Sequence, residues 1–240
     1  MFIILARLFL MTTSSYSQEF NLKECFSTDS VKINHYEKSA KEDGLKKRIL
    51  VFGQIHGDEP SSGKLAQFWI ERLKNIDPSN FWRIIPILNP DGSKLNIRMN
   101  ANGVDLNRNF PTSDWNELAL KKWKNREKSD PRRFPGHVAG SEKEVRCAIA
   151  HIEDFRPDLV ISIHTPYGVF DFDGPPVKKY NSKNLLPWKR LGTFTGSLGR
   201  YVWDERNIPV LTIELKEDSL NTNSNDFIKL QDRLSRLITN

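Results

Sequence analysis

Hydrophobic and polar positions alternate along the chain in blocks that predict strands and helices in turn. Four short runs are almost wholly apolar, as expected for strands inside a covered sheet, and they span 48–53, 81–88, 158–164 and 209–215. Elsewhere apolar residues recur at helical spacing, which predicts helices over 60–76, 114–124, 141–155 and 226–238. This alternation indicates an α/β domain in which a mixed, mainly parallel sheet carries helices on both faces.

The starts of two predicted helices carry further signals. Pro60 falls in the first helical turn, where the amide hydrogen that proline lacks has no helical partner. Ser141 and Glu144 fit a capping box, in which each side chain accepts a hydrogen bond from the backbone amide of the other. Residues 166–184 are rich in aromatic residues, Gly and Pro, and we expect them to form a loop.

Side chains suited to metal binding lie where three of the predicted strands end. His56 and Glu59 follow the first strand, His164 ends the third, and Glu214 lies near the end of the fourth. Ligands of open α/β sheets bind beyond the carboxyl ends of the strands, so we expect these residues to converge at one edge. Two His and one Glu form a frequent ligand set for catalytic zinc, and Glu214 is then placed to act as a general base.

Each of these residues could also have a purely structural role. The His-x-x-Glu spacing is common by chance, and a His at a strand end, such as His164, is often a hydrogen-bonded core residue. Glu214 could face solvent, but its neighbours are apolar, and a buried carboxylate needs a compensating partner. Arg98 and Arg108, in the polar stretch 89–111, fit either a solvated loop or the stabilisation of an oxyanion.

The composition fits one α/β domain. The chain has 240 residues, which suffice for a sheet covered by helices, and 38% of them are hydrophobic. The formal net charge of +6 favours anionic partners, such as carboxylate-rich substrates. The basic residues are dispersed and no motif of nucleic-acid binding is present, so we expect a solvated basic face and no nucleic-acid partner.

The N-terminus predicts export. Residues 2–11 are apolar apart from one Arg, and this run is too short to span a membrane. Small residues just before Gln18 suit cleavage by a signal peptidase. We therefore expect a signal peptide over residues 1–17, a single domain over residues 18–240, a periplasmic location and no stable membrane insertion. A cytoplasmic location is the alternative if the segment is not processed.

Two cysteines and three further histidines complete the candidate residues. Cys25 and Cys147 could form a disulfide in an oxidising compartment or stay as two thiols, and the sequence leaves both open. His151 falls off the apolar face of its helix and is expected to be exposed, as is His137 in a surface loop. No partner is evident for His35.

The polar stretch 89–111 reads NPDGSKLNIRMNANGVDLNRNFP. Together with the segments HGDE, SIH and TIEL, in this order within residues 48–216, it resembles the zinc carboxypeptidases of the M14 family. The part GVDLNRNFP, preceded by an Arg and by Asn-Ala-Asn, is similar to the branch of bacterial murein peptide amidases. The resemblance implies a mixed, mainly parallel sheet of eight strands between helices.

The resemblance also implies roles for the metal-binding and catalytic residues. One Zn²⁺ ion would be held by His56, Glu59 and His164. Asp105 would orient a ligating imidazole through the ring nitrogen that faces away from the metal. Glu214 would activate the attacking water and then protonate the leaving amine.

Three further residues are implied to contact the substrate. Arg98 would polarise the scissile carbonyl and stabilise the oxyanion, while Asn107 and Arg108 would bind a substrate carboxylate. Digestive members of the family carry a substrate-binding Tyr before the catalytic Glu, whereas the segment 191–199 has none and resembles the amidase branch. Tyr167 is expected to form a wall of the cleft.

From these implications we expect a zinc metallopeptidase that acts on peptidoglycan stem peptides or muropeptides. The expected bond joins γ-D-glutamate to meso-diaminopimelate. An alternative within the same class is a carboxypeptidase that releases another C-terminal residue from stem peptides or proteins. A non-catalytic module that binds the cell wall is the alternative of a different class, and the presence of all ligands and of the base argues against it. The oligomeric state stays open.

Overall fold

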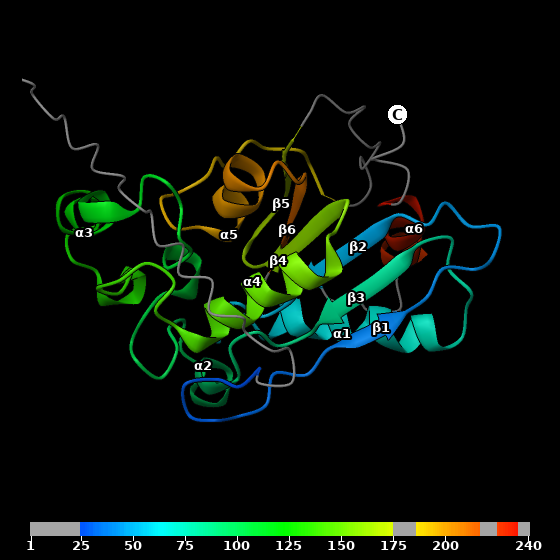
Figure 1. Cartoon of the computed structure of the whole chain (residues 1–240), viewed down its shortest axis with the longest axis horizontal. Coiled ribbons are helices and arrows are strands. Elements are labelled where there is room, and N and C mark those ends of the chain that lie inside the picture. The colour runs from blue at the N-terminus through cyan, green and yellow to red at the C-terminus, as the bar shows by residue number, and fades with distance from the viewer. Residues whose placement is uncertain (1–24, 175–185, 217–224, 235–240) are drawn as a thin grey trace, which may run out of the picture.

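The computed structural model describes residues 25–174, 186–216 and 225–234, which form one central sheet with helices on both faces (Figure 1). The expected signal peptide, residues 1–17, lies outside the described residues. The strands are β1 (Tyr36–Lys38), β2 (Arg48–Phe52), β3 (Phe81–Ile85), β4 (Leu159–His164), β5 (Tyr167–Asp173) and β6 (Val210–Lys216). The longer helices are α1 (Pro60–Lys74), α3 (Asn116–Asn125), α4 (Lys143–Phe155) and α6 (Asn225–Leu234). The short helical segments are α2 (Pro90–Leu95), η2 (Leu106–Arg108), η3 (Pro131–Arg133), α5 (Leu198–Arg200) and η4 (Tyr201–Glu205).

The strands follow the order β1-β3-β2-β4-β6-β5 across the sheet. β3, β2, β4 and β6 run parallel to one another, and the edge strands β1 and β5 are antiparallel to their neighbours. In Figure 1, α4 lies in front of the sheet, and α1 and α6 lie behind it. This arrangement confirms the predicted fold class. Within the described residues, no helix is both long and apolar enough to cross a bilayer.

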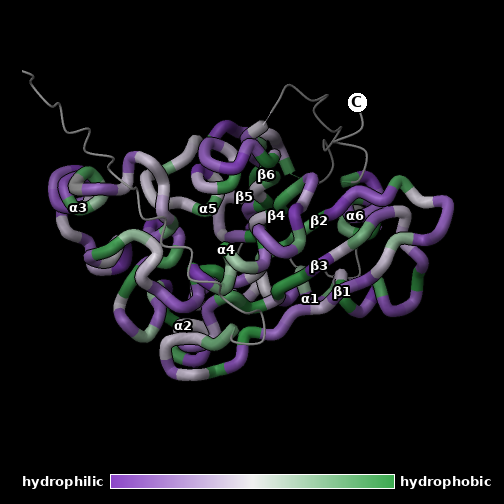
Figure 2. Tube along the Cα trace, in the orientation of Figure 1, coloured by the Kyte–Doolittle hydropathy of each residue, from purple (hydrophilic) through white to green (hydrophobic). Residues whose placement is uncertain are grey.

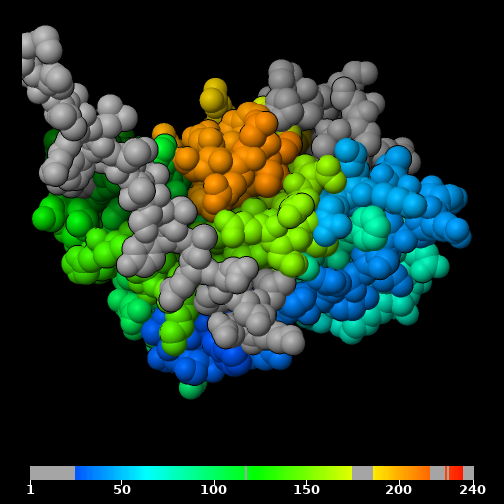
Figure 3. All heavy atoms as spheres, viewed as in Figure 1, coloured from blue at the N-terminus to red at the C-terminus, as the bar shows by residue number. Residues whose placement is uncertain are grey.

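Alternation along the strands directs apolar side chains into two cores, one on each face of the sheet. Ile49 and Val51 of β2 pack with Trp69 on the face of α1 and α6. Leu50 and Phe52 point to the opposite face, which α4 and η4 cover. Figure 2 shows the central strands as mainly hydrophobic, and Figure 3 shows α4 beside the α5–η4 segment at the surface. Each large apolar side chain buried in this way stabilises the fold by about 1.5–3 kcal/mol.

Where the structure describes them, the predicted strands and helices match it to within a few residues. Residues 235–238 of the last predicted helix lie outside the described part. The loop prediction for 166–184 is wrong in its first part. Tyr167–Asp173 form β5, which pairs antiparallel with β6. Asp171 alternates with Phe170 and Phe172, which is the period of a strand at a sheet edge. The residues 175–184 of the predicted loop lie outside the described part.

The described residues contribute six strands to the sheet, not the eight that the family resemblance implied. Side chains cap two of the short helical segments between β3 and β4. The side chain of Asn89 accepts a hydrogen bond from the amide of Gly92, and that of Asp130 accepts one from the amide of Arg132. These caps, each followed by a proline, stabilise the helical turns that they begin.

The predicted capping box at the start of α4 is absent. The N-cap residue is Glu142, and the Ser141 hydroxyl donates a hydrogen bond to the Glu142 carboxylate at 2.6 Å. The carboxylate of Glu144 accepts one from the backbone amide of Thr28 at 2.8 Å. A contact with the N-terminal segment has therefore replaced the local one.

Cys25 and Cys147 form a disulfide that joins the N-terminal segment to α4. The prediction of an exposed His151 is wrong, because the same segment packs against α4 beside β3, and His151 is fully buried there. Its ring lies 4.8 Å from that of His35, the contact that the sequence did not reveal. Burial lowers the pKa of His151 to about 3. His137 is exposed, as predicted.

We expect the Cys25→Ala/Cys147→Ala double variant to fold but to lose about 2–4 kcal/mol of unfolding free energy, because the disulfide closes a long loop in the unfolded chain. The two cysteines are 122 positions apart. Urea unfolding followed by circular dichroism measures the change, with His137→Ala at an exposed site as the control. An unchanged unfolding midpoint in the double variant would contradict the expectation.

Candidate active site

Polar side chains replace apolar ones toward the carboxyl ends of β4 and β6, on the face of the sheet that α4 and η4 cover. Val160 of β4 belongs to the core on this face, and Ser162 and His164 follow it at alternate positions. The strand register pairs Ser162 with Thr212 and His164 with Glu214. This edge of the sheet opens into a cavity of about 620 Å³.

The structure brings the eight residues implied by the resemblance together at this cavity. Seven of them line it: His56, Glu59, Arg98, Asn107, Arg108, His164 and Glu214. The eighth, Asp105, is fully buried beside His56, with its Oδ1 atom 3.3 Å from the His56 Nε2 atom. The sequence motifs lie on four separate segments, and the fold places them around one centre.

Three side chains form a compact cluster at the end of β2 and β4. Glu59 occupies the N-cap position of α1, and its carboxylate lies between two imidazoles. Its Oε1 atom is 2.7 Å from His56 Nδ1, and its Oε2 atom is 3.1 Å from His164 Nδ1. Burial alone would raise the pKa of Glu59, but the two imidazoles hold it well below its usual range. The carboxylate is therefore ionised at neutral pH.

This cluster fits a zinc ion. One nitrogen or oxygen atom from each of His56, Glu59 and His164 lies within 4.8 Å of the others. The Nε2 atom of His164 is 2.9 Å from the Ser162 hydroxyl, and that of His56 faces Asp105, so both Nδ1 atoms point to the shared centre. Imidazoles held from behind in this way are typical of metal ligands. Two His and one carboxylate also match the donor set of catalytic zinc.

Close backbone contact positions the turn that carries His56. A Cβ atom on Gly57 would lie 2.0 Å from the carbonyl carbon of Gly92 in α2, so a larger residue cannot fit without a shift of the backbone. The Gly57 amide and the Asn89 side chain both donate to the carbonyl oxygen of Arg98, at 3.3 and 3.2 Å. The turn after β2 and the stretch that carries Arg98 therefore form one unit.

A buried ion pair orients Arg98. Its Nε atom donates to Asp105 at 2.9 Å, and its Nη1 atom lies 3.2 Å from His56 Nδ1 and 3.7 Å from Glu59. Burial would raise the pKa of Asp105, but Arg98 and His56 hold it well below its usual range. The ionised Asp105 fixes the guanidinium so that one end points toward the cluster, where negative charge would develop in a reaction.

Glu214 differs from the other acidic groups of the site. It is 8% exposed, and its Oε2 atom has no hydrogen-bond partner among the described residues. Burial raises the pKa of Glu214 to about 7, against the opposing influence of His164. A carboxyl group with this pKa can both accept and release a proton near neutral pH, as a general base and acid must.

Arg108 and Asn107 form a basic corner of the cavity. The Arg108 guanidinium lies 4.3 Å from the ring centre of Phe194, and its Nη1 atom donates to the carbonyl of Asn107 at 2.9 Å. The side-chain oxygen of Asn107 accepts the amide of Leu198 at 2.8 Å, so its NH₂ group is left for a ligand. The corner thus presents donors and a positive charge, which suit a carboxylate.

The segment 191–199, which lacks a Tyr, packs tightly beside this corner. A Cβ atom on Gly196 would lie 2.0 Å from the Arg108 carbonyl oxygen, and its φ of +73° also favours glycine. The amide of Phe110 donates to the carbonyl of Gly196 at 2.9 Å. Tyr167 also lines the cavity and is 65% exposed, as expected for a wall residue.

Sequence reasoning missed the acidic residues of β5. Asp171 and Asp173 line the cavity, and Asp171 lies opposite Thr212 in the sheet. The Oδ2 atom of Asp171 accepts the amide of Leu191 at 2.9 Å. Burial, together with Asp171 and Asp204, raises the pKa of Asp173 to about 6. The available signal was the spacing of two acidic residues on one face of a strand. Because residues 166–184 were predicted to form a loop, this signal was not recognised.

Comparison of sequences identifies relatives with the same motifs. The chain matches the zinc carboxypeptidase family, Peptidase_M14, over residues 27–170. It is 34% identical to murein peptide amidase A of Vibrio campbellii over 179 residues, which cover 70% of this chain and 69% of the relative. It is 37% identical to murein peptide amidase A of Escherichia coli K12 over 120 residues, and this match spans 49% of the chain and about half, 48%, of the relative.

Solved structures share the fold. Murein-tripeptide amidase MpaA from Escherichia coli O157 aligns with 88% of this chain and 89% of its own, with a TM-score of 0.62 and 24% identity. Thrombin activatable fibrinolysis inhibitor aligns with 90% of this chain and 68% of its own, with a TM-score of 0.69 and 16% identity. These likenesses show the fold, and the sequence match over more than half of the chain shows the family. The chain belongs to the M14 family of zinc carboxypeptidases.

Proposed function

We propose that the protein is a zinc-dependent peptidase that cleaves the bond between γ-D-glutamate and meso-diaminopimelate in peptidoglycan stem peptides. The observation that carries this proposal is the buried Glu214 carboxyl group, which lines the cavity beside three candidate metal ligands with its Oε2 atom unpaired among the described residues. A buried carboxyl oxygen without a hydrogen-bond partner destabilises a fold, which argues that it serves a function. Similarity to two murein peptide amidases supports the substrate class.

His56, Glu59 and His164 would hold the zinc ion, which when bound supplies Lewis-acid polarisation in the cleft. Glu214 would take a proton from the attacking water and deliver it to the leaving amine. Its pKa of about 7 makes both transfers accessible near neutral pH. Arg98, held by Asp105, would stabilise the oxyanion that forms on the scissile carbonyl.

The basic corner would bind the carboxylate of the leaving residue. Arg108 supplies a guanidinium fork and Asn107 supplies an amide NH₂ group at the same wall of the cavity. A charge-assisted pair of this kind is short and directional, so it would fix the residue on the C-terminal side of the scissile bond. This arrangement favours a substrate with a free carboxylate one residue beyond that bond.

Groups of both signs lie further along the cavity, where the side chain of the leaving residue would extend. Asp171 and Asp173 line it from β5, and Lys189 and Arg190 line it from the segment that follows. Asp171 lies two strand positions behind Glu214 in the sheet register, which corresponds to about 7 Å. The side chain of meso-diaminopimelate ends in an ammonium and a carboxylate, so it offers a partner to each sign of charge.

Two alternatives predict different products. A carboxypeptidase that releases another C-terminal residue would use the same ligands and base but would not need a zwitterionic side chain. A non-catalytic wall-binding module would have no use for a buried carboxyl oxygen of Glu214 that has no partner among the described residues. We also propose a periplasmic location, where the polymer is the accessible substrate; in the cytoplasm, released fragments would take its place.

We expect the zinc-loaded protein to release meso-diaminopimelate from L-Ala-γ-D-Glu-meso-diaminopimelate, and a chelator to abolish the release. Plain L-peptides and intact peptidoglycan serve as parallel substrates, and mass spectrometry identifies the products. Cleavage of plain L-peptides alone would contradict the proposed substrate. The matched control is Glu214→Gln, which keeps the shape but cannot accept the proton, and it should retain zinc while turnover falls by about 10²–10⁴-fold. An active Glu214→Gln variant would refute the assignment of the base.

We expect the metal-free protein to lose stability as pH rises, because burial raises the pKa of Glu214 from 4.5 to about 7. Below pH 4.5 the carboxyl group is protonated in both folded and unfolded states. Between the two pKa values the unfolded chain releases the proton first, so the free energy of unfolding falls. Glu214→Gln should therefore match the wild type at low pH and exceed it by up to about 3 kcal/mol above pH 7. Urea unfolding with chelator measures this, and a more stable wild type at high pH would contradict it.

Asp173→Asn should weaken binding of a leaving residue with a side-chain ammonium, because the variant removes a negative charge and keeps the shape. We expect KM to rise roughly tenfold with little change in kcat. Because the pKa of Asp173 is about 6, its carboxylate becomes protonated as pH falls through 6. The wild type should then bind this substrate as weakly as the variant does, whereas the affinity of the variant should not change. A substrate whose leaving residue lacks the ammonium is the control. Equal KM changes for both substrates would contradict the assignment.

A further inference from the structure

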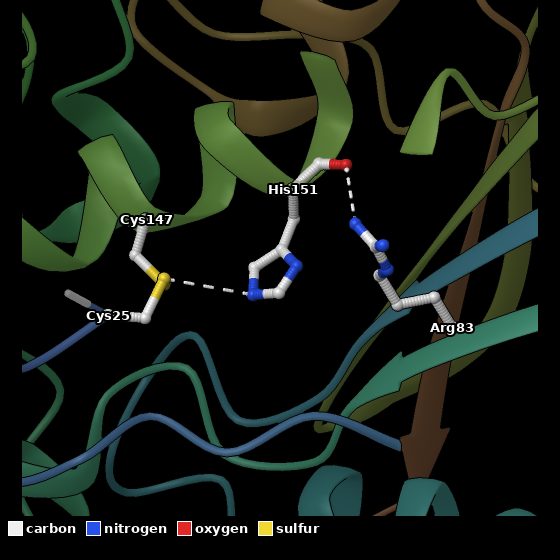
Figure 4. The surroundings of a disulfide bond; sticks show 4 residues. All are labelled: Cys25, Arg83, Cys147 and His151. Carbon is white, nitrogen blue, oxygen red and sulfur yellow. Dashed lines mark hydrogen bonds between the residues drawn. A yellow bond between two sulfur atoms is a disulfide. The ribbon is translucent and has the colours of Figure 1, made fainter. Parts of the chain in front are cut away.

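A second cluster of metal-binding side chains lies around the disulfide, where the N-terminal segment packs against α4 beside β3. Cys147 and His151 are four residues apart on α4, so both project from one face of the helix, and Cys25 reaches them from the N-terminal segment (Figure 4). The His151 Nε2 atom is 3.8 Å from the Cys25 sulfur. One donor atom from each of the three residues lies within 4.8 Å of the others.

The disulfide leaves His151 poorly satisfied. The residue is fully buried, and its Nδ1 atom has no hydrogen-bond partner among the described residues. Its Nε2 atom faces a disulfide sulfur, which is a weak acceptor. Arg83 donates to the backbone carbonyl of His151 and not to the ring (Figure 4). A buried polar atom without a partner destabilises a fold, and no described residue compensates for this imidazole in the oxidised state.

Hydrogen bonds hold Cys25 in place independently of the disulfide. The amide of Thr28 donates to the Glu144 carboxylate on α4 at 2.8 Å, and the Ser27 hydroxyl donates to Asp91 at 2.6 Å. The carbonyl of Cys25 itself accepts the amide of Ile33 at 2.8 Å. Reduction of the disulfide would therefore leave the two sulfur atoms as neighbours, beside the same imidazole.

We propose that reduction converts this cluster into a structural site for one thiophilic divalent cation such as Zn²⁺, with Cys25 Sγ, Cys147 Sγ and His151 Nε2 as ligands. A dithiol reductant transfers two electrons and two protons to the disulfide, which becomes two thiols while the reductant becomes a disulfide. Binding of the cation then releases the two thiol protons, and the two thiolates balance its charge. Soft thiolates with an imidazole select zinc-like ions over magnesium or calcium.

The geometry suits such an ion. Donor atoms around tetrahedral zinc lie about 3.5–3.8 Å apart, given bond lengths of about 2.3 Å to sulfur and 2.0 Å to nitrogen. The observed 3.8 Å between Cys25 Sγ and His151 Nε2 is close to the roughly 3.5 Å expected for a sulfur and a nitrogen ligand. Cys147 Sγ belongs to the same group of donor atoms within 4.8 Å, and reduction allows the two sulfur atoms to separate. The same three residues would thus fasten the N-terminal segment to α4 as a disulfide in an oxidising compartment and as a metal site in a reducing one.

Cobalt titration of the full chain tests this proposal without reference to activity. The cavity site is first filled with zinc while the disulfide is intact, and excess zinc is removed. One half of the protein is then reduced with a dithiol, which is removed under nitrogen, and Co²⁺ is added to both halves. We expect a thiolate-to-cobalt charge-transfer band, with one more bound ion per chain, in the reduced half alone. The ligand set of the cavity contains no sulfur, so it cannot produce this band.

Variants of the proposed ligands show which residues bind the ion, and three of the outcomes below would contradict the proposal. Cys147→Ala should lose the band, and His151→Gln should bind Co²⁺ at least tenfold more weakly with an altered spectrum. Circular dichroism shows whether the reduced protein stays folded, or unfolds and refolds when Co²⁺ is added. Either result supports the site if the charge-transfer band is also present. A reduced, folded protein without the band would overturn the proposal, as would reduced protein that stays unfolded with Co²⁺. Unchanged affinity and spectrum in His151→Gln would also overturn it.

Discussion

The in-register parallel pairing of β2, β4 and β6 is the constraint on which the site depends. Side chains alternate along a strand, so His164 and Glu214 share a face only because they are directly paired. A slip of one residue would turn Glu214 into the core beside α1 and α6. Ile161 and Ile213 oppose such a slip, because both are buried in that core and would move to the polar face. Apolar residues that never contact a substrate thus determine where the carboxylate lies.

The buried charges of the site depend on one another in the same way. Glu59 lies between His56 and His164, and Asp105 lies between His56 and Arg98. Removing one member leaves a partner buried and unpaired, which costs several kcal/mol even without any loss of chemistry. Substitutions at Glu59 or Asp105 therefore change folding and metal binding together. The Oε2 atom of Glu214 lies outside this network. Glu214→Gln can therefore remove the proton-accepting carboxylate while keeping the shape of the side chain.

The sequence predicted the central strands well and the edge of the sheet poorly, for physical reasons. Buried parallel strands such as β2 and β4 are continuous apolar runs, which few other structures produce. β5 is an edge strand beside a cavity, so its Asp171 and Asp173 interrupt the apolar pattern and Gly168 adds a turn signal. His151 was misplaced because it lies at the margin of the helix face that periodicity identifies, and the N-terminal segment, which is distant in the sequence, covers that margin. The candidate site was accessible from the sequence because short motifs carry its residues, whereas the groups that would distinguish substrates lie between the motifs.

The segment 191–199 has a consequence for the thermodynamics of binding. Its backbone is hydrogen-bonded to Phe110 and to the side chain of Asn107, and Gly196 abuts the Arg108 carbonyl. A wall that is ordered before the substrate arrives loses little conformational entropy on binding, so more of the contact energy contributes to affinity. The same rigidity gives the cleft little capacity to adapt. A side chain of the wrong charge would meet an unpaired ionic group, and discrimination would come from that penalty and not from closure around the correct substrate.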